Sequence, residues 1–381
     1  MSDYSKQSNQ RLFLRDILRP DQNSFAIIRL IAAFAVVVSH CYLLQSGSSE
    51  NEPLYTSTGY SLGAYGVQVF FVLSGILVAQ SLMRSTSLLD FAIARALRIF
   101  PALIVCVLMI SFLLGPALSS LGIVDYYRSG VLYAYLAKTL FLTTGSAPLP
   151  QLFSANPVPN VVNLSLWTLK YEVLCYASLA VLGGPLLGYG SRSTRTAAAF
   201  AAWVGIMIVF PPGLGQGNSG IANAHFFFLF FGVGVTAYLG RRLIPVTTSV
   251  LGVLFLFFFA TVGTKWASIG AVLFLGYAAI YVASIDLGPL RQFTNRYDLS
   301  YGTYIYGVPV SQALLVIKPT LGVWPLIALT TVIVLLLAFL SWVLIERPAL
   351  ALRKRIATLL DGLQGSVRHS SSDADARKAA G

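Results

Sequence analysis

The chain has 381 residues, of which 56% are hydrophobic and 10% are charged, and its mean hydropathy is +0.74. This composition excludes an ordinary soluble domain and indicates a protein that crosses a membrane several times. The formal net charge is +12, but the basic residues lie in loops between apolar runs, so the charge does not indicate nucleic-acid binding. The apolar runs are long and do not alternate, which favours helices over a barrel.

The polar segment 1–24 precedes an apolar run at 25–44, which is long enough to span a bilayer as a helix of about 30 Å. The run contains Arg29 and His40, which share one helical face and lie about 16 Å apart along the axis. Ionisable groups inside a span usually face a protein interior or a wet cavity. We therefore expect this face to line a polar cavity. The alternative is that Arg29 snorkels to the membrane surface and His40 caps the helix.

The run at 25–44 is longer than the apolar part of a signal peptide and no small-residue cleavage site follows it, so we expect an uncleaved first span. Nine further apolar runs predict spans at about 60–83, 99–118, 163–184, 196–211, 223–240, 247–263, 267–286, 300–318 and 323–345. The predicted fold is an all-α integral membrane protein with about ten transmembrane helices around a central polar cavity. Its parts are an N-terminal segment at 1–24, a membrane domain at 25–346 and a basic tail at 347–381 whose end has a disordered composition.

Two stretches between the spans are distinctive. Residues 84–98 form a polar link that ends with Arg95 and Arg98 directly before the third span. The longer stretch 119–163 holds a short apolar piece at 131–142 and a run rich in Pro and Asn, which predicts an ordered loop or a re-entrant element.

The distribution of Lys and Arg predicts the orientation. With ten spans both termini lie on one side of the membrane, and most of the 26 basic residues fall on that side. The positive-inside rule then makes both termini cytoplasmic.

This orientation predicts a site. Glu172, in the fourth span, would meet His40 in the outer half of one cavity, and Arg95 and Arg98 would form a cationic mouth below it. An imidazole, a carboxylate and an inner group of guanidinium ions suggest a polyanionic donor entering from inside and proton chemistry near the outside.

Several residues have simpler explanations. Ser74 beside Gly75 favours helix packing over a nucleophile, and Arg95 and Arg98 are alternatively topology charges. The cysteines lie in apolar runs without metal spacing, which predicts buried thiols (Cys41, Cys106 and Cys175). The tyrosines of a late segment are alternatively interfacial anchors (Tyr301, Tyr304 and Tyr306). The sequence assigns no role to the two other histidines, His225 and His369.

Six short motifs occur in the order in which one known family carries them. They are Arg29 and His40 with ten residues between them, FFVLSG at 70–75, Arg95 and Arg98 followed by Ile99 and Pro101, WTL at 167–169 with Glu172 and Tyr176, SYGTYIY at 300–306, and ERP at 346–348. With these motifs the chain resembles membrane acyltransferase family 3, the O-acetylases that modify extracytoplasmic glycans. The resemblance covers about residues 25–350.

The resemblance implies transfer of an acyl group, usually acetyl, from cytoplasmic acyl-CoA to a hydroxyl of an exported polysaccharide or glycolipid. Arg95 and Arg98 would bind the CoA phosphates, and His40 would act as general base or carry the acyl group covalently. Glu172 and Arg29 would complete the catalytic set. Acetyl-CoA or another acyl-CoA is the expected donor, with no metal.

The expected partners are acyl-CoA, a sugar, membrane lipid and no nucleic acid, with a homo-oligomer or a glycan-assembly protein as further options. Two other functions stay open at this point. Intramembrane Glu, His and Arg also serve proton-coupled transporters and flippases, and a purely structural subunit of a glycan-assembly system has the same composition.

Overall fold

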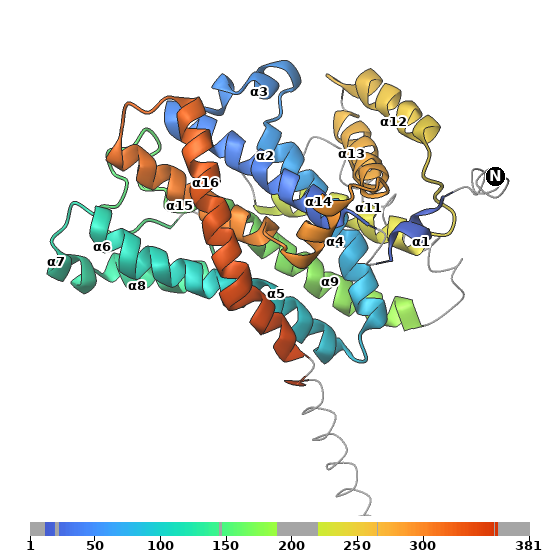
Figure 1. Cartoon of the computed structure of the whole chain (residues 1–381), viewed down its shortest axis with the longest axis horizontal. Coiled ribbons are helices and arrows are strands. Elements are labelled where there is room, and N and C mark those ends of the chain that lie inside the picture. The colour runs from blue at the N-terminus through green and yellow to red at the C-terminus, as the bar shows by residue number, and fades with distance from the viewer. Residues whose placement is uncertain are drawn as a thin grey trace, which may run out of the picture.

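The computed structural model describes residues 12–19, 23–144, 147–188, 220–264, 266–353 and 355–356. Within these residues the protein is helical and forms no strand beyond an isolated bridge between Phe13 and Pro245 (Figure 1). The all-α prediction is therefore confirmed for the described part of the chain.

The α-helices are α1 (Leu14–Ile17), α2 (Phe25–Ser46), α3 (Pro53–Thr58), α4 (Leu62–Arg84), α5 (Leu88–Met109), α6 (Gly115–Leu118), α7 (Ile123–Arg128), α8 (Gly130–Leu140), α9 (Leu169–Gly188), α11 (Gly220–Leu239), α12 (Thr248–Thr261), α13 (Ala267–Ala283), α14 (Pro289–Arg296), α15 (Ser300–Ile317) and α16 (Val323–Ser341). Two 3-10 segments (Ser49–Asn51 and Leu164–Thr168) and two π-helical segments (Ile110–Leu114 and Trp342–Glu346) complete the regular structure of the described residues.

Four helical stretches are long and apolar enough to cross a membrane: Phe25–Ser46, Leu62–Arg84, Leu88–Leu118 and Val323–Arg353. Shorter apolar helices occupy 223–239, 248–261 and 267–283, where spans were predicted. The predicted span at 196–211 lies outside the described residues. The structure thus describes a helical membrane protein with four candidate spans, and the number ten stays a prediction.

The third span begins earlier than predicted. Ser87 caps the N-terminus of α5, since its hydroxyl accepts a hydrogen bond from the amide of Asp90. Arg95 and Arg98 consequently lie inside the helix, so the prediction of a polar link over 84–98 is wrong from Leu88 onward. A helix fixes these two side chains one turn apart on a rigid element.

Both π-helical segments are followed by a proline one residue after their caps, Pro116 after the first and Pro348 after the second. Proline has no amide hydrogen, so it cannot continue the regular i→i−4 ladder, and a wider turn absorbs the mismatch. Near the first segment, the hydroxyls of Tyr126 and Tyr127 donate to the carbonyls of Ser111 and Phe112, at 2.9 and 3.2 Å. The second segment turns Glu346 into the protein interior, where it is 2% exposed.

The stretch 119–163, predicted as a loop or re-entrant element, contains α7 and α8 and then a run of turns. α8 packs beside α5 (Figure 1). The turns are tied to α15 because the Asn156 amide donates to the Gln312 side chain at 2.6 Å and Gln312 donates to the Val161 carbonyl at 2.9 Å. This hydrogen bonding makes the turns an ordered cover over the end of α15.

α4 lies between α2 and α11, and small residues let these helices approach closely. At the crossing with α11, a Cβ on Gly75 would overlap the Phe231 carbonyl, and the Cα of Gly234 would lie 2.9 Å from it. Gly75 therefore packs backbone against backbone.

α15 is largely buried, and α16 crosses it before ending over α5 (Figure 1). Tyr301, Tyr304 and Tyr306 of α15 are all buried, between 4% and 8% exposed. The alternative that these tyrosines are interfacial anchors is therefore wrong. They belong to the core because α15 is covered by α2, α5 and α16. The three cysteines are buried free thiols, as predicted.

Candidate active site

Three arginines from two helices converge on one internal cavity of about 100 Å³, which we call the guanidinium cavity. Arg29 comes from α2, and Arg95 and Arg98 come from α5. The remaining polar lining includes Ser74, Thr168, Glu172, Tyr176, Ser300, Tyr301 and Tyr304. The structure thus brings Arg29, Arg95, Arg98 and Glu172 together, four of the five residues predicted for the site.

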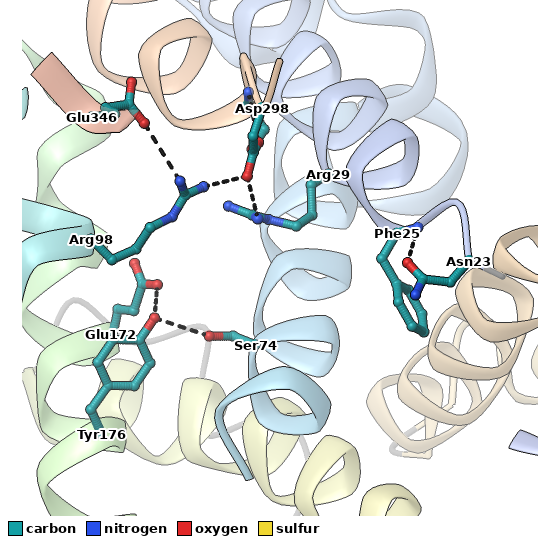
Figure 2. Close-up of polar contacts among 10 residues, drawn as sticks. Asn23, Phe25, Arg29, Ser74, Arg98, Glu172, Tyr176, Asp298 and Glu346 are labelled. Carbon is teal, nitrogen blue, oxygen red and sulfur yellow. Dashed lines mark hydrogen bonds and ion pairs between the residues drawn. The ribbon is translucent and has the colours of Figure 1, made fainter. Parts of the chain in front are cut away.

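A carboxylate absent from the predicted set joins two of these arginines. One Asp298 oxygen, Oδ2, lies 2.9 Å from Arg29 Nη1 and 2.7 Å from Arg98 Nη2 (Figure 2). The other oxygen, Oδ1, accepts hydrogen bonds from the Ser300 hydroxyl at 2.6 Å and the Ser300 amide at 3.3 Å. Asp298 therefore connects α2, α5 and the N-terminus of α15, where the helix dipole also favours a negative charge.

The surroundings of Asp298 stabilise the ionised form of its carboxyl group. Burial by itself raises the pKa of this carboxyl, but Arg29, Arg98 and the hydrogen bonds from Ser300 outweigh burial and hold the pKa well below its usual range. Asp298 is consequently an anion at any physiological pH.

Arg98 has a second acidic neighbour. Its Nη1 lies 3.6 Å from Oε2 of Glu346, the residue that the second π-helical segment turns inward (Figure 2). Glu346 Oε1 accepts a hydrogen bond from the Ser341 hydroxyl at 3.0 Å. The Arg98 charge is thus balanced by the protein, which differs from the free cationic mouth that the sequence predicted.

Arg95 is different from its two neighbours. Among the described residues no carboxylate forms an ion pair with Arg95, and its Nε is buried without a hydrogen-bond partner. Its guanidinium lies 5.9 Å from the centroid of the Tyr176 ring, a modest cation–π contact. A buried guanidinium without a counter-ion is costly unless something else supplies a negative charge. Arg95 is therefore the arginine that is available to an anionic ligand.

Glu172 and Tyr176 lie one turn apart on α9 and form a short chain with Ser74 of α4 (Figure 2). The Tyr176 hydroxyl donates to Glu172 Oε1. Because a phenol has one proton, the Ser74 hydroxyl then donates to the Tyr176 oxygen, 3.3 Å away. Ser74 is thus a cavity residue and not only the packing residue that its neighbour Gly75 suggested.

His40 lines a second cavity of about 260 Å³, which we call the histidine cavity. Its Nδ1 lies 3.4 Å from the Ser165 hydroxyl of the 3-10 segment Leu164–Thr168. The cavity has aromatic walls and a few polar groups, a composition typical of small-molecule sites. Its other lining residues include Ser39, Ser49, Tyr60, Ser61, Trp167, Asn223, Phe226, Phe227 and Tyr304.

The prediction that His40 and Glu172 meet in one cavity is wrong in this structure. Glu172 lines the guanidinium cavity and His40 the histidine cavity, and Val67 and Tyr304 line both. Arg29 and His40 do both face the interior, and neither alternative explanation fits. Arg29 pairs with Asp298 instead of snorkelling, and His40 contacts Ser165 instead of only capping the helix.

Sequence reasoning missed Asp298, Ser165 and Glu52. Glu52 is 2% exposed; it accepts a hydrogen bond from the Ser39 hydroxyl at 2.7 Å and another from the amide of Leu62, the first residue of α4. Asp298 and Glu52 lie in short polar links, where no hydrophobic period marks an inward side. Ser165 lies in the apolar 3-10 segment Leu164–Thr168, where a single serine gives no signal of a role. A capping position gave the one available signal, since Asp298 stands two residues before the helix-starting Ser300.

The family that the motifs suggested is confirmed by comparison with known proteins. The family model described as "Acyltransferase domain", acyltransferase family 3, matches residues 22–347. The chain belongs to this acyltransferase family.

Two curated relatives agree with the family. The "O-acetyl transferase" of Shigella phage Sf6 is 30% identical over 342 residues, which is 85% of this chain and 95% of the relative. "Nodulation protein 10" of Rhizobium leguminosarum bv. viciae is 30% identical over 366 residues, 87% of this chain and 94% of the relative. No solved structure matches the chain. The protein is therefore an acyltransferase with membrane helices, and its two cavities are the candidate sites for its substrates.

Proposed function

We propose that this acyltransferase moves an acyl group, acetyl in the simplest case, from acyl-CoA to a hydroxyl of an extracytoplasmic polysaccharide or glycolipid. The observation that carries the proposal is the pairing of two cavities of different chemistry. One holds Arg95, which forms no ion pair with any described residue, and the other holds His40 among aromatic walls. The name of the phage relative, an O-acetyl transferase, supports acetyl and an oxygen acceptor.

The donor end of the site is the guanidinium cavity. CoA carries phosphates, and a planar guanidinium binds phosphate in a bidentate fashion. Arg95 is the residue that can do so without breaking an existing ion pair, whereas Arg29 and Arg98 are held by Asp298. In the proposed arrangement of about ten spans with cytoplasmic termini, this cavity faces the cytoplasm, where acyl-CoA is found.

The acceptor end is the histidine cavity. In the proposed reaction the Nδ1–H group of His40 donates a hydrogen bond to the Ser165 oxygen, which leaves Nε2 free to take the proton of a sugar hydroxyl. The sugar oxygen attacks the thioester carbonyl, a C–O bond forms, the C–S bond breaks, and the proton passes from His40 to the departing thiolate. Trp167 is half-buried and gives the sugar ring an aromatic face.

Two measurements test this function. Mass spectrometry of surface glycans from cells with and without the protein should show one mass difference per modified sugar, equal to the acyl group. Purified protein in detergent should transfer or hydrolyse the acyl group of acetyl-CoA without any ion gradient. A glycan that loses export but keeps its ester, or a protein inert toward every acyl-CoA tested, would contradict the proposal and favour a flippase or transporter.

A further inference from the structure

Two side chains border both cavities. Val67 of α4 and Tyr304 of α15 line both the guanidinium cavity and the histidine cavity. We call them the partition residues. Any group that passes from Arg95 to His40 by the shortest internal route has to pass these two side chains.

Tyr304 is held across this route from two sides. Its hydroxyl lies 2.6 Å from Oγ1 of Thr168 in the 3-10 segment, and its ring meets the Phe70 ring edge to face with centroids 5.8 Å apart. Thr168 Oγ1 donates in turn to the Ser165 carbonyl at 3.4 Å, so the Tyr304 hydroxyl is the donor to Thr168. The ring is 7% exposed and cannot turn while both contacts stay intact.

The same hydrogen bonds lead to His40. Ser165, whose carbonyl accepts from Thr168, is the residue whose hydroxyl contacts His40 Nδ1. Release of Tyr304 from Thr168 therefore frees the segment that positions the imidazole. The position of the tyrosine and the orientation of the histidine are coupled through the single turn Leu164–Thr168.

We propose that Tyr304 is a positioning residue that closes the passage between the two cavities while it is bonded to Thr168 and opens it for the acyl-thioester arm. The proposal rests on the proposed function for the identity of the arm, but not for the passage itself. In the closed arrangement the Tyr304 ring keeps the acyl-thioester arm of a donor, whose phosphates bind Arg95, on the guanidinium-cavity side and apart from His40. In the open arrangement the thioester carbonyl reaches His40.

Cysteine accessibility tests the passage without any substrate. The parent protein has Cys41, Cys106 and Cys175 replaced by Ala, and carries either Ser74→Cys in the guanidinium cavity or Ser49→Cys in the histidine cavity. A charged, membrane-impermeant methanethiosulfonate is added to spheroplasts or to inside-out vesicles. We expect each new cysteine to react from one side only, and the two cysteines from opposite sides.

Opening the partition should change this pattern for the Ser74→Cys protein alone. With Tyr304→Ala, the cysteine at position 74 should also react from the side that reaches position 49. Thr168→Val and Tyr304→Phe, which keep the bulk of the partition, should speed that reaction about fivefold, the effect of losing one hydrogen bond on an equilibrium. These milder variants keep the test decisive if Tyr304→Ala does not fold.

Tyr306→Ala is the matched control. Tyr306 is a buried tyrosine of the same helix that lines an apolar cavity and neither of the two site cavities. Labelling at position 74 should stay one-sided in this variant. Two-sided labelling in the parent, one-sided labelling in every Tyr304 and Thr168 variant, or an equal change in Tyr306→Ala would each overturn the proposal. None of these outcomes depends on acyl transfer, so the proposed function is tested separately.

Discussion

The Asp298 carboxylate bridges Arg29 and Arg98, residues that lie 269 and 200 positions away in the sequence, through a single oxygen at 2.9 and 2.7 Å. All three side chains are at most 22% exposed. One carboxylate thus fixes two guanidinium groups that come from different helices. Among the described residues, Arg95 is then the arginine of the cavity that forms no ion pair.

Replacing Asp298 by Asn should destabilise the protein by about 3 kcal/mol, because it leaves two largely buried guanidinium ions without their shared anion. The thermal midpoint of the purified protein in detergent measures this effect. Asp286→Asn is the matched control, since Asp286 pairs with Arg291 at 3.2 Å but is 68% exposed, and its loss should cost less than about 1 kcal/mol. Equal midpoints for the two variants would show that the bridge is not structural.

Arg95→Ala should weaken acetyl-CoA binding by about tenfold to a hundredfold, the usual effect of losing a hydrogen bond between charged groups. Calorimetry on the protein in detergent measures the change. Arg84→Ala removes an exposed arginine from the end of α4 and should leave the affinity as it was. If Arg95→Ala binds acetyl-CoA as well as the control does, Arg95 is a topology charge.

Ser165→Ala should lower kcat for acyl transfer about tenfold and leave KM for acyl-CoA nearly unchanged, because it removes the hydroxyl that orients His40 but no donor contact. Ser178→Ala is the control, since its hydroxyl donates to the Cys175 carbonyl of its own helix and lines neither site cavity. A rise in KM at unchanged kcat would show that Ser165 serves donor binding instead.

Gly75→Ala should prevent close packing of α4 on α11 and lower stability by about 1–3 kcal/mol or block insertion, since the new methyl group meets backbone atoms of Phe231 and Gly234. Gly252→Ala places the same methyl group in open space on α12 and should be neutral or slightly stabilising. Comparable yields and thermal midpoints for both variants would contradict the packing described here.

The positions of most helices could be predicted from the sequence because a membrane helix needs a long apolar run, and such runs are visible without any knowledge of packing. The start of α5 could not be predicted in this way. Its first turns carry Asp90, Arg95 and Arg98, whose charges suggested a loop. Asp90 pairs with Arg353 and Arg98 pairs with Glu346, and these ion pairs permit a helix that hydropathy alone does not indicate.

The composition of the site was predicted only where a motif marked it. Arg29, Arg95, Arg98 and Glu172 do converge, but their partner Asp298 lies between two helices in a link with no periodicity. Between the cavities of Glu172 and His40 lie Tyr304 of α15 and Val67 of α4, which come from two different helices. Register along one helix predicts a shared face, but it does not predict which side chain from another helix divides that face.

The amount of acyl ester on the surface glycan of a His40→Ala strain tests most directly whether acyl transfer requires His40. The variant should insert at the normal level, and mass spectrometry of the surface glycan should find no acyl group. The Cys41→Ala strain, altered at the next residue on a different face of α2, should keep the full amount of ester. Normal ester in a correctly inserted His40→Ala protein would contradict the role of His40 and with it the use of the histidine cavity for transfer.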